Sequence, residues 1–218
     1  MLRGELFSGD MVKAYLENRK SHTCRPIKCK YSNTHIKWRT DKYGQSLVEM
    51  QSDVEGETFW KNEDGTTTHQ LLAYRELKPK HRPGDYIYCR ETWGTYSKDW
   101  QDSTTGFLYR ADYPDGAEGY WHEPEHINWC DLPKWRPSIH MPREAARLFF
   151  RVTRVEVMRL EDVTEEFARG DGFQIREGFS ALVQFKHFWR QTYGPDARWM
   201  WVYWTEPCSR EEALGDAI

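Results

Sequence analysis

The sequence predicts an α+β protein that is mainly β, with a few short helices. The strongest apolar patterns, over residues 148–158 and 199–204, alternate or run continuously over strand-like lengths. Helical spacing is confined to three short stretches, of which two begin at the expected N-cap residues Thr164 and Ser180. Because the 218 residues contain neither an internal repeat nor a low-complexity tract, we expect a single domain over residues 1–206.

The first expected elements are a strand over residues 2–8 and a helix over about 11–20. Pro26 disfavours a helical conformation at the residue before it, so the chain from residue 22 to 25 should leave the helix extended. Residues 28–80 are polar, with weak alternation and turn signals at glycines. We expect this segment to be an insertion of one or two hairpins at the rim of the fold.

A second group of strands follows the insertion. Arg82-Pro-Gly-Asp85 predicts a turn that leads into a strand over residues 86–91, and 107–110 is a further strand candidate. Residues 112–134 are rich in proline, glycine and acidic side chains, which is typical of a loop.

The C-terminal part should contribute the two longest strands. Within residues 148–158 the alternation changes phase, which predicts a β-bulge near Thr153-Arg154. Residues 199–204 are apolar at successive positions, as expected for a strand that is buried on both faces. The polar residues 207–218 are expected to be a loose tail.

Composition and charge exclude two classes of protein. The formal net charge is −3, so the chain is not a polycation that coats nucleic acid, and contact with a nucleic acid would need a local basic patch. No stretch approaches the roughly 18 apolar residues of a membrane span, and the N-terminus lacks the apolar core of a signal peptide. We therefore expect a cytoplasmic protein that does not bind membranes.

The cysteines indicate packed, reduced thiols. Their number is odd and no CxxC pair occurs, which argues against a disulfide framework or a zinc site; they are Cys24, Cys29, Cys89, Cys130 and Cys208. An alternative is a metal-binding pair of Cys24 and Cys29 together with His22 or His35. We prefer packed thiols, and expect neither a metal nor a cofactor.

Aromatic residues are unusually frequent, with 11 tryptophans, 12 tyrosines and 10 phenylalanines. Several tryptophans adjoin arginine or lysine, and aromatic rings beside guanidinium groups can stack on nucleobases. The alternative is that most of the tryptophans fill the core of an irregular β-barrel. Composition leaves both interpretations open.

Five motifs, taken in order, resemble the phage and prophage proteins of the ASCH group, which belong to the PUA-like superfamily. They are Leu6-Phe-Ser-Gly9, Arg19-Lys-x-x-Thr-x-Arg25, Pro83-Gly-Asp85 followed by Arg90-Glu-Thr-Trp93, Trp135-Arg-Pro-Ser-Ile-His-Met-Pro142, and Phe188-Trp189 followed by Trp199 to Trp204. The resemblance extends from residue 2 to about 206, interrupted by the insertion. It implies a PUA-like pseudo-β-barrel with short helices at the barrel openings. It also implies RNA or a modified nucleoside as the ligand, and the host cytoplasm as the location if a phage encodes the chain.

Some small bacterial members of this group are amidohydrolases that act on N(4)-acetylcytidine, and the resemblance places their catalytic residues on Lys20, Thr23 and Asp171. Asp171 stands where the family has glutamate, so its carboxylate reaches about 1.5 Å less. Amide hydrolysis needs a nucleophile and a base, roles that suit the Thr23 hydroxyl and a deprotonated Lys20. Arg19 and Arg25 would help Lys20 to lose its proton, and Asp171 would orient the leaving amine or shuttle a proton. The alternative is that Arg19 and Lys20 are solvated cations at a helix end.

Two further segments supply candidate ligand-binding residues. Two prolines stiffen the segment over residues 135–142, which holds its polar side chains in fixed positions. Together with the strand end at 90–93, we expect this segment to meet the one over 20–25 at one mouth of the barrel. The expected ligand-binding residues are Arg25, Arg90, Glu91, Trp93, Arg136, Ser138, His140 and Arg143.

Three functions follow from these observations. The leading hypothesis is a protein that binds RNA or a modified nucleobase in a cleft at the barrel mouth. The second is an amidohydrolase that removes an acyl group from nucleosides similar to N(4)-acetylcytidine. The third is a non-catalytic protein interaction module whose tryptophans all lie in the core.

Overall fold

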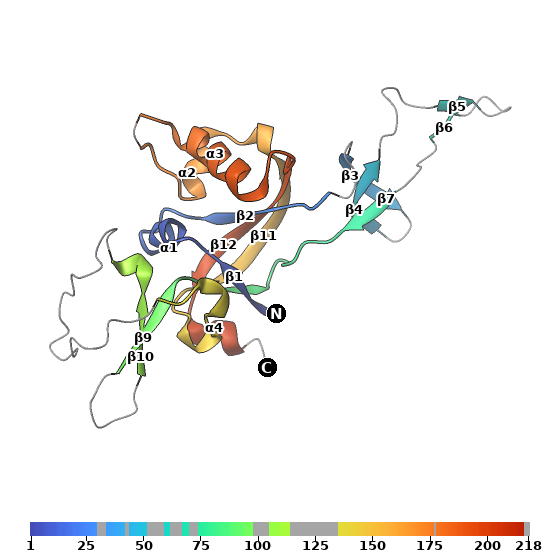
Figure 1. Ribbon diagram of the computed structural model, residues 1–218. Helices are drawn as coiled ribbons and strands as arrows, with labels where there is room; N and C mark the ends of the chain where they lie inside the picture. The colour runs from blue at the N-terminus through green and yellow to red at the C-terminus, as the bar shows by residue number, and fades with distance from the viewer. Residues whose placement is uncertain are drawn as a thin grey trace.

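A five-stranded mixed sheet forms the centre of the molecule (Figure 1). The computed structural model describes residues 1–29, 34–41, 44–51, 59–61, 67–69, 74–97, 105–113, 135–176 and 178–215. In spatial order the strands of the sheet are β1 (Leu2–Leu6), β8 (Tyr86–Arg90), β11 (Phe149–Arg159), β12 (Trp199–Cys208) and β2 (His22–Pro26). Only β1 and β8 pair in parallel, and the other neighbours are antiparallel. The protein is therefore a mixture of α and β structure, with short helices around a sheet.

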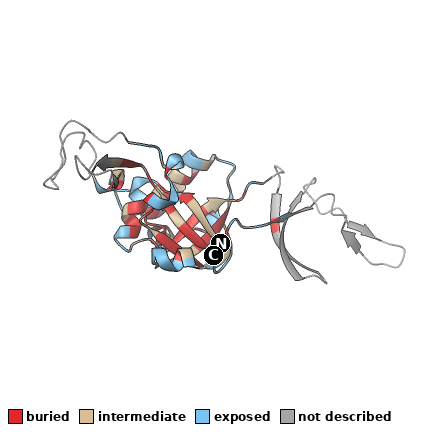
Figure 2. Ribbon diagram, turned by 90° about the horizontal axis from the view of Figure 1, so that it is seen from below, coloured by how far each residue is buried: buried red, intermediate tan, exposed pale blue. Residues whose placement is uncertain are grey.

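The two longest strands of this sheet, β11 and β12, pair with each other at its centre. The register shifts between Val152 and Arg154, so the predicted bulge near Thr153 is confirmed. Val152 and Val202 are fully buried on these two strands, as expected for residues at the centre of a sheet that is covered on both faces. Figure 2 shows the buried residues concentrated along these strands and on the helix faces that turn toward them.

Helices α1 (Gly9–Leu16), α2 (Glu165–Gly170) and α3 (Ala181–Tyr193) pack against the sheet. The expected caps are present, since Thr164 accepts a hydrogen bond from the backbone of Phe167 and Ser180 accepts one from Val183. α1 ends earlier than its predicted limit at residue 20. Asn18 has a φ of 54°, and this left-handed turn directs the following residues away from the helix axis.

Apolar side chains cover both faces of β2 and β12 because residues alternate along a strand. On one face Tyr203 packs in a core with Val12 and Tyr15 of α1. On the opposite face Cys24 and Val202 pack against α2 and α3, where Phe185 and Trp189 are buried. β2 therefore runs between these two cores, and its successive side chains point alternately to its two faces.

The inserted segment forms the expected hairpins. β3 (Thr34–Asp41), β4 (Gly44–Gln51) and β7 (Tyr74–Leu77) make an antiparallel sheet, and β5 (Phe59–Lys61) pairs with β6 (Thr67–His69). In Figure 1 these strands lie to one side of the five-stranded sheet. Nearly all of the predicted loop over residues 112–134 lies outside the described residues.

Two elements differ from the expectations. β9 (Trp93–Ser97) pairs with β10 (Thr105–Tyr109), and Gly94 and the polar residues of β9 hide the alternation that would have indicated this strand. The expected loose tail over 207–218 instead extends β12 to Cys208 and then forms α4 (Arg210–Gly215). Ala213 anchors α4 because its side chain is fully buried, and Arg210 donates a hydrogen bond to the carbonyl oxygen of Glu144.

Four single-turn 3-10 helices complete the described structure. They are η1 (Arg110–Asp112), η2 (Ser138–His140), η3 (Arg143–Ala145) and η4 (Leu160–Asp162). Among the described residues, no helix is both long enough and apolar enough to cross a membrane.

The sheet does not close into a barrel, because β1 and β2 remain its two edges. Side chains rather than a backbone ladder join these edges. The Arg25 guanidinium of β2 donates through Nη2 to the carbonyl oxygen of Leu6, at 3.0 Å, and through Nε to the Glu5 carboxylate, at 3.0 Å. The gap between the edges is where the candidate site lies.

Candidate functional site

A cavity of about 60 Å³ lies where the end of β1 approaches β2, between α1 and α3. Its polar wall consists of Lys20, Thr23, Arg25 and Asp171. The facing wall is aromatic and comes mainly from α3: Phe185, Phe188, Trp189 and Tyr193. Such a volume holds a few water molecules or a small polar group. It is far below the roughly 300 Å³ at which sites for whole small-molecule ligands usually begin.

Lys20 and Asp171 form a buried ion pair at the cavity. The Lys20 Nζ donates to Asp171 Oδ1 at 2.6 Å and to the Asp171 carbonyl oxygen at 2.7 Å. The exposed fractions of the two side chains are 1% and 8%. Two charges at this distance interact strongly where water is excluded, so the pair fixes both side chains at the cavity wall.

The backbone brings these two residues together although 151 positions separate them. Lys20 and Asp171 form an antiparallel β-bridge, and the backbone of Ser21 donates to the carbonyl oxygen of Gly170 at 2.8 Å. Gly172 makes this approach possible. It has a φ of +100°, and a Cβ there would lie 2.7 Å from the Cβ of Ala14 in α1.

Thr23 and Arg25 point to the same side of β2 because they are two residues apart. The Arg25 Nη1 donates to Thr23 Oγ1 at 2.9 Å. A hydroxyl that accepts this bond keeps its own proton for a second partner. Thr23 is 2% exposed, so its hydroxyl is shielded from bulk water and faces the cavity.

A charged cluster around Glu5 holds Arg25 in place. The Glu5 carboxylate accepts from Arg25 at 3.0 Å, contacts the His81 ring nitrogen Nε2 at 2.8 Å and also pairs with Lys80. Burial by itself raises the pKa of Glu5, but the hydrogen bond with His81 and the charges of Arg25 and Lys80 lower this pKa to about 2. No local pattern predicts this cluster, because its members come from three segments that are distant in the sequence and follow no motif.

Arg19 does not face Lys20 as expected. Its guanidinium donates to the Glu17 carboxylate at 2.5 Å and to the carbonyl oxygen of Gly172 at 2.9 Å. The charged partner of Lys20 is the Asp171 carboxylate. In this arrangement Lys20 is a hydrogen-bond donor, and acting as a base would first require that it give up a proton.

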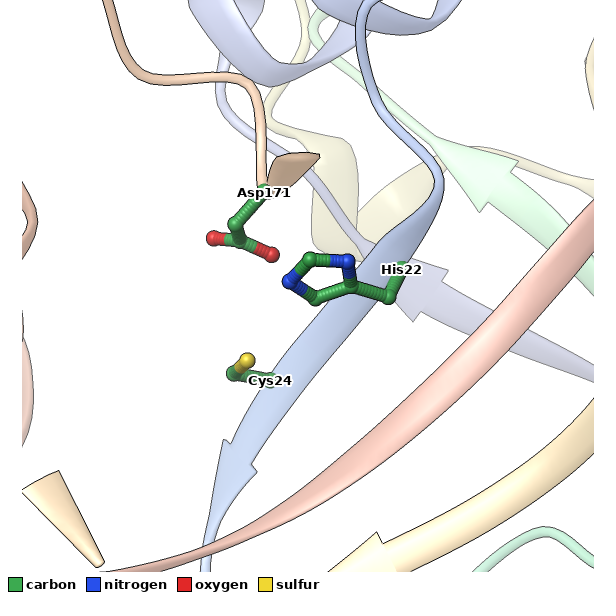
Figure 3. A group of neighbouring side chains, drawn as sticks. All are labelled: His22, Cys24 and Asp171. Atoms are coloured by element: carbon green, nitrogen blue, oxygen red, sulfur yellow. The ribbon is translucent and has the colours of Figure 1, made fainter. Parts of the chain in front are cut away.

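The opposite face of β2 presents a second group of chemically active side chains. His22, Cys24 and Asp171 are all buried, and their potential ligand atoms lie within 4.8 Å of one another (Figure 3). Burial lowers the pKa of His22 to about 4, so the ring is neutral at neutral pH. Burial also raises the pKa of the Cys24 thiol well above its usual range. Cys29, which the alternative metal-site interpretation paired with Cys24, is exposed.

The expected ligand-binding residues Arg90, Trp93 and Arg136 do not line the cavity, and Trp93 and Arg136 pack against each other. Trp93 and Arg136 exchange backbone hydrogen bonds of 3.2 and 2.7 Å, and the Arg136 guanidinium lies 5.1 Å from the Trp93 ring centroid. Arg90 donates to the carbonyl oxygen of Ile139. The Trp93 side chain is buried, so its ring is not an exposed platform for a base.

Glu91 belongs to a structural ion pair. Its carboxylate accepts hydrogen bonds of 2.9 and 3.0 Å from the Arg147 guanidinium, which also bonds Asp112 at 2.8 Å. Burial raises the pKa of Glu91, and the hydrogen bonds from Arg147 oppose that rise. The other expected residues, Ser138, His140 and Arg143, belong to η2 and η3, where His140 and Arg143 are exposed.

The described structure therefore divides the expected site residues into two groups. Lys20, Thr23, Arg25 and Asp171 share one cavity, whereas the group around Trp93 and Arg136 lies outside its lining. Comparison of the chain with protein-family models, with curated proteins and with solved structures finds no match.

Proposed function

We propose that this chain is an amidohydrolase that removes a small acyl group from the exocyclic amine of a nucleoside such as N(4)-acetylcytidine. One observation carries the proposal: Lys20, Thr23, Arg25 and Asp171 line the same buried cavity. The choice of substrate comes from the resemblance to the ASCH group, as does the proposal that the open sheet is a variant of the PUA-like pseudo-β-barrel.

Thr23 is the proposed nucleophile. Its hydroxyl oxygen attacks the acyl carbonyl carbon, and the hydroxyl proton passes through the Lys20–Asp171 pair to the leaving nitrogen as the C–N bond breaks. Water then hydrolyses the ester on Thr23, which releases the carboxylic acid and restores the hydroxyl. Each cycle consumes one water and leaves the protein unchanged.

Arg25 is the proposed donor to the developing oxyanion. A guanidinium has five N–H groups, and within the described structure four of those of Arg25 bond Glu5, Thr23 and the carbonyl oxygens of Leu6 and Cys24. One N–H on Nη2 remains for a substrate oxygen beside Thr23. Because the buried Glu5 carboxylate holds the half-buried guanidinium in place, this donor is positioned before the substrate arrives.

The replacement of the family's glutamate by Asp171 is compatible with this chemistry. The β-bridge between Lys20 and Asp171 brings their backbones together, so the shorter side chain still reaches Nζ at 2.6 Å. The small volume also suits the reaction, because an acyl group fills it while the base stays outside. Leu6, which lines the cavity and is 45% exposed, lies at the proposed entrance.

Acetate release from N(4)-acetylcytidine tests this proposal. We expect wild-type protein to release acetate and Thr23→Val, which keeps the shape of the side chain, to lose at least about 100-fold in rate. Thr205→Val is the matched control, since Thr205 is also buried but bonds Tyr15 and Ser21 outside the cavity lining. No acetate from the wild type, or equal rates for wild type and Thr23→Val, would contradict the proposal.

Binding of RNA is the second candidate function. It is favoured by the exposure of Arg136, His140 and Arg143 on one short segment, which forms a local basic surface on a chain of net charge −3. Titration of short single-stranded RNA, followed by tryptophan fluorescence, should show binding that weakens with salt. The double variant Arg136→Ala/Arg143→Ala should bind more weakly, and unchanged binding would exclude this surface. A chain that neither binds RNA nor releases acetate would instead fit the interaction module.

A further inference from the structure

We propose that His22, Cys24 and Asp171 form a binding site for one divalent transition-metal ion, with Zn²⁺ the best match. The potential ligand atoms, an imidazole nitrogen, a thiol sulfur and a carboxylate oxygen, lie within 4.8 Å of one another, and all three residues are buried. This inference does not rest on the proposed hydrolase activity, although both proposals involve Asp171.

The backbone brings the three side chains together. His22 and Cys24 are two residues apart on β2, so they project from the same face of the strand. Asp171 reaches this place because residues 20 and 171 form a β-bridge and Ser21 bonds Gly170. Main-chain hydrogen bonds therefore hold the three residues close to one another, so their proximity does not depend on mobile side chains.

The hydrogen bonds of His22 favour a metal-binding tautomer. Ser21 Oγ donates to the carbonyl oxygen of Gly170 at 3.3 Å and lies 3.1 Å from His22 Nδ1, so Nδ1 can donate its proton to Ser21. The other nitrogen, Nε2, is buried and has no hydrogen-bond partner among the described residues. Figure 3 shows Nε2 turned toward the space between the carboxylate and the thiol. An unpaired buried nitrogen is costly, and a metal ion would satisfy it.

The donor set matches zinc in chemistry and approximately in spacing. Zinc accepts imidazole, thiolate and carboxylate ligands together, whereas Mg²⁺ and Ca²⁺ prefer oxygen alone. Tetrahedral bonds of the usual lengths would place these ligand atoms about 3.4 to 3.6 Å apart. The observed limit of 4.8 Å therefore requires the side chains to close by about 1 Å around the ion.

The surroundings resemble those of a metal ligand shell. Rings of Phe167 and Trp204 lie 4.2 and 4.6 Å from the His22 ring and exclude water from it. Lys20 donates to Asp171 Oδ1, and a carboxylate retains further lone pairs for an ion after accepting one such bond. The thiolate and the carboxylate would offset the two charges of the ion, while Asp171 Oδ1 keeps its hydrogen bond from the Lys20 ammonium group.

The same residue types could form a cysteine–histidine–aspartate triad, but the geometry disfavours that assignment. In such a triad the carboxylate bonds Nδ1 and the thiol faces Nε2. Here Nδ1 faces Ser21, and both the carboxylate and the thiol lie on the Nε2 side.

An ion at this site would have a free coordination position toward the cavity. Cys24 and Asp171 both line the cavity, so the ion can enter from there and hold a water molecule on that side. Zinc sites that exchange ligands have three protein ligands and one open position, whereas purely structural zinc sites have four protein ligands.

Metal analysis of the full chain tests the inference. The protein is stripped with a chelator, reloaded with zinc chloride, dialysed, and measured by plasma mass spectrometry. We expect one zinc per chain, and cobalt(II) loading should produce a sulfur-to-cobalt charge-transfer band. Cys24→Ser and His22→Gln should abolish both signals, whereas Cys89→Ser, which alters another buried thiol, should retain them.

Two additional measurements cover poorly folded variants and separate this inference from the proposed hydrolase. Zinc should raise the melting temperature of the wild type, a result that needs no variant at all. Thr23→Val should bind one zinc even though it loses acetate release. Wild-type protein that retains no zinc after reloading, or variants of His22 and Cys24 that fold and bind it as well as the wild type, would overturn the inference.

Discussion

Replacing Glu5 with glutamine tests how the two edges of the open sheet are held together. Glu5 is buried near the end of β1, and its carboxylate pairs with Arg25 of β2, with Lys80 and with His81. The His81 ring in turn packs against the ring of Tyr203. Glutamine preserves the shape of the side chain but removes its negative charge. The variant therefore leaves the Arg25 guanidinium without its anionic partner.

The magnitude follows from the pKa of Glu5, which falls from an ordinary value of 4.5 to about 2. Each pKa unit corresponds to about 1.4 kcal/mol, so the ionised carboxylate stabilises the folded state by about 3 kcal/mol. Because the folded pKa is the lower one, this stabilisation is complete above pH 4.5 and disappears as the pH falls toward 2. The difference in unfolding free energy between wild type and Glu5→Gln should shrink over the same interval.

Urea unfolding at a series of pH values measures this difference. We expect wild type to exceed Glu5→Gln by about 3 kcal/mol at neutral pH, with the two converging near pH 2. Glu76→Gln is the control, because Glu76 pairs with Lys78 at the surface and such pairs contribute little. A difference between wild type and Glu5→Gln that stays constant across this pH range would refute the role assigned to the carboxylate.

Three further substitutions test the packing that positions the cavity, each by urea unfolding. Gly172→Ala should destabilise the fold by at least about 2 kcal/mol, because Gly172 has a φ of +100° and the new Cβ would lie 2.7 Å from the Cβ of Ala14. Gly178→Ala is the control: Gly178 has a φ of +79° but open space around it, so this variant should lose only about 1 kcal/mol. Equal effects of the two glycine variants would contradict the close approach to α1. Arg147→Leu should cost about 3 to 5 kcal/mol because it leaves the buried Glu91 carboxylate unpaired, whereas Arg154→Ala, at an exposed pair with Glu156, should cost less than about 1 kcal/mol. A loss of unfolding free energy below about 1 kcal/mol in Arg147→Leu would show that the buried Glu91 carboxylate does not depend on Arg147. Phe185→Ala should cost about 3 to 5 kcal/mol, since Phe185 is 1% exposed between α3 and the sheet, and a loss below about 1 kcal/mol would contradict its place in that core.

Local sequence patterns were sufficient to predict most of the central elements. Pro26 indicated the extended path of β2, the phase change near Thr153 indicated the bulge of β11, and the caps at Thr164 and Ser180 marked the starts of α2 and α3. Each of these signals depends on residues within a few positions of one another. That is why they can be identified without knowledge of the fold.

Elements without a local signal were missed. α4 depends on the burial of one small residue, Ala213, and on a hydrogen bond from Arg210 to a distant turn. The helix predicted to reach residue 20 ends at Leu16, because Asn18 adopts a left-handed conformation that lets Lys20 meet Asp171. In both cases tertiary contacts override the pattern of the segment itself.

The candidate site shows the same division. The motif from Arg19 to Arg25 placed Lys20, Thr23 and Arg25 near one another, and the resemblance suggested Asp171. Neither could reveal that His22 and Cys24, on the alternate face of β2, also meet Asp171, because that depends on the bridge between residues 20 and 171. The Glu5 cluster likewise depends on the turn at His81, which follows a long insertion.

Intact-protein mass spectrometry during turnover of N(4)-acetylcytidine tests whether Thr23 is the nucleophile. We expect a transient acetyl adduct, mapped by peptide fragmentation to Thr23, that is present in the wild type and absent from Thr23→Val. Acetate release by the wild type with no adduct on Thr23, together with full activity of Thr23→Val, would contradict it.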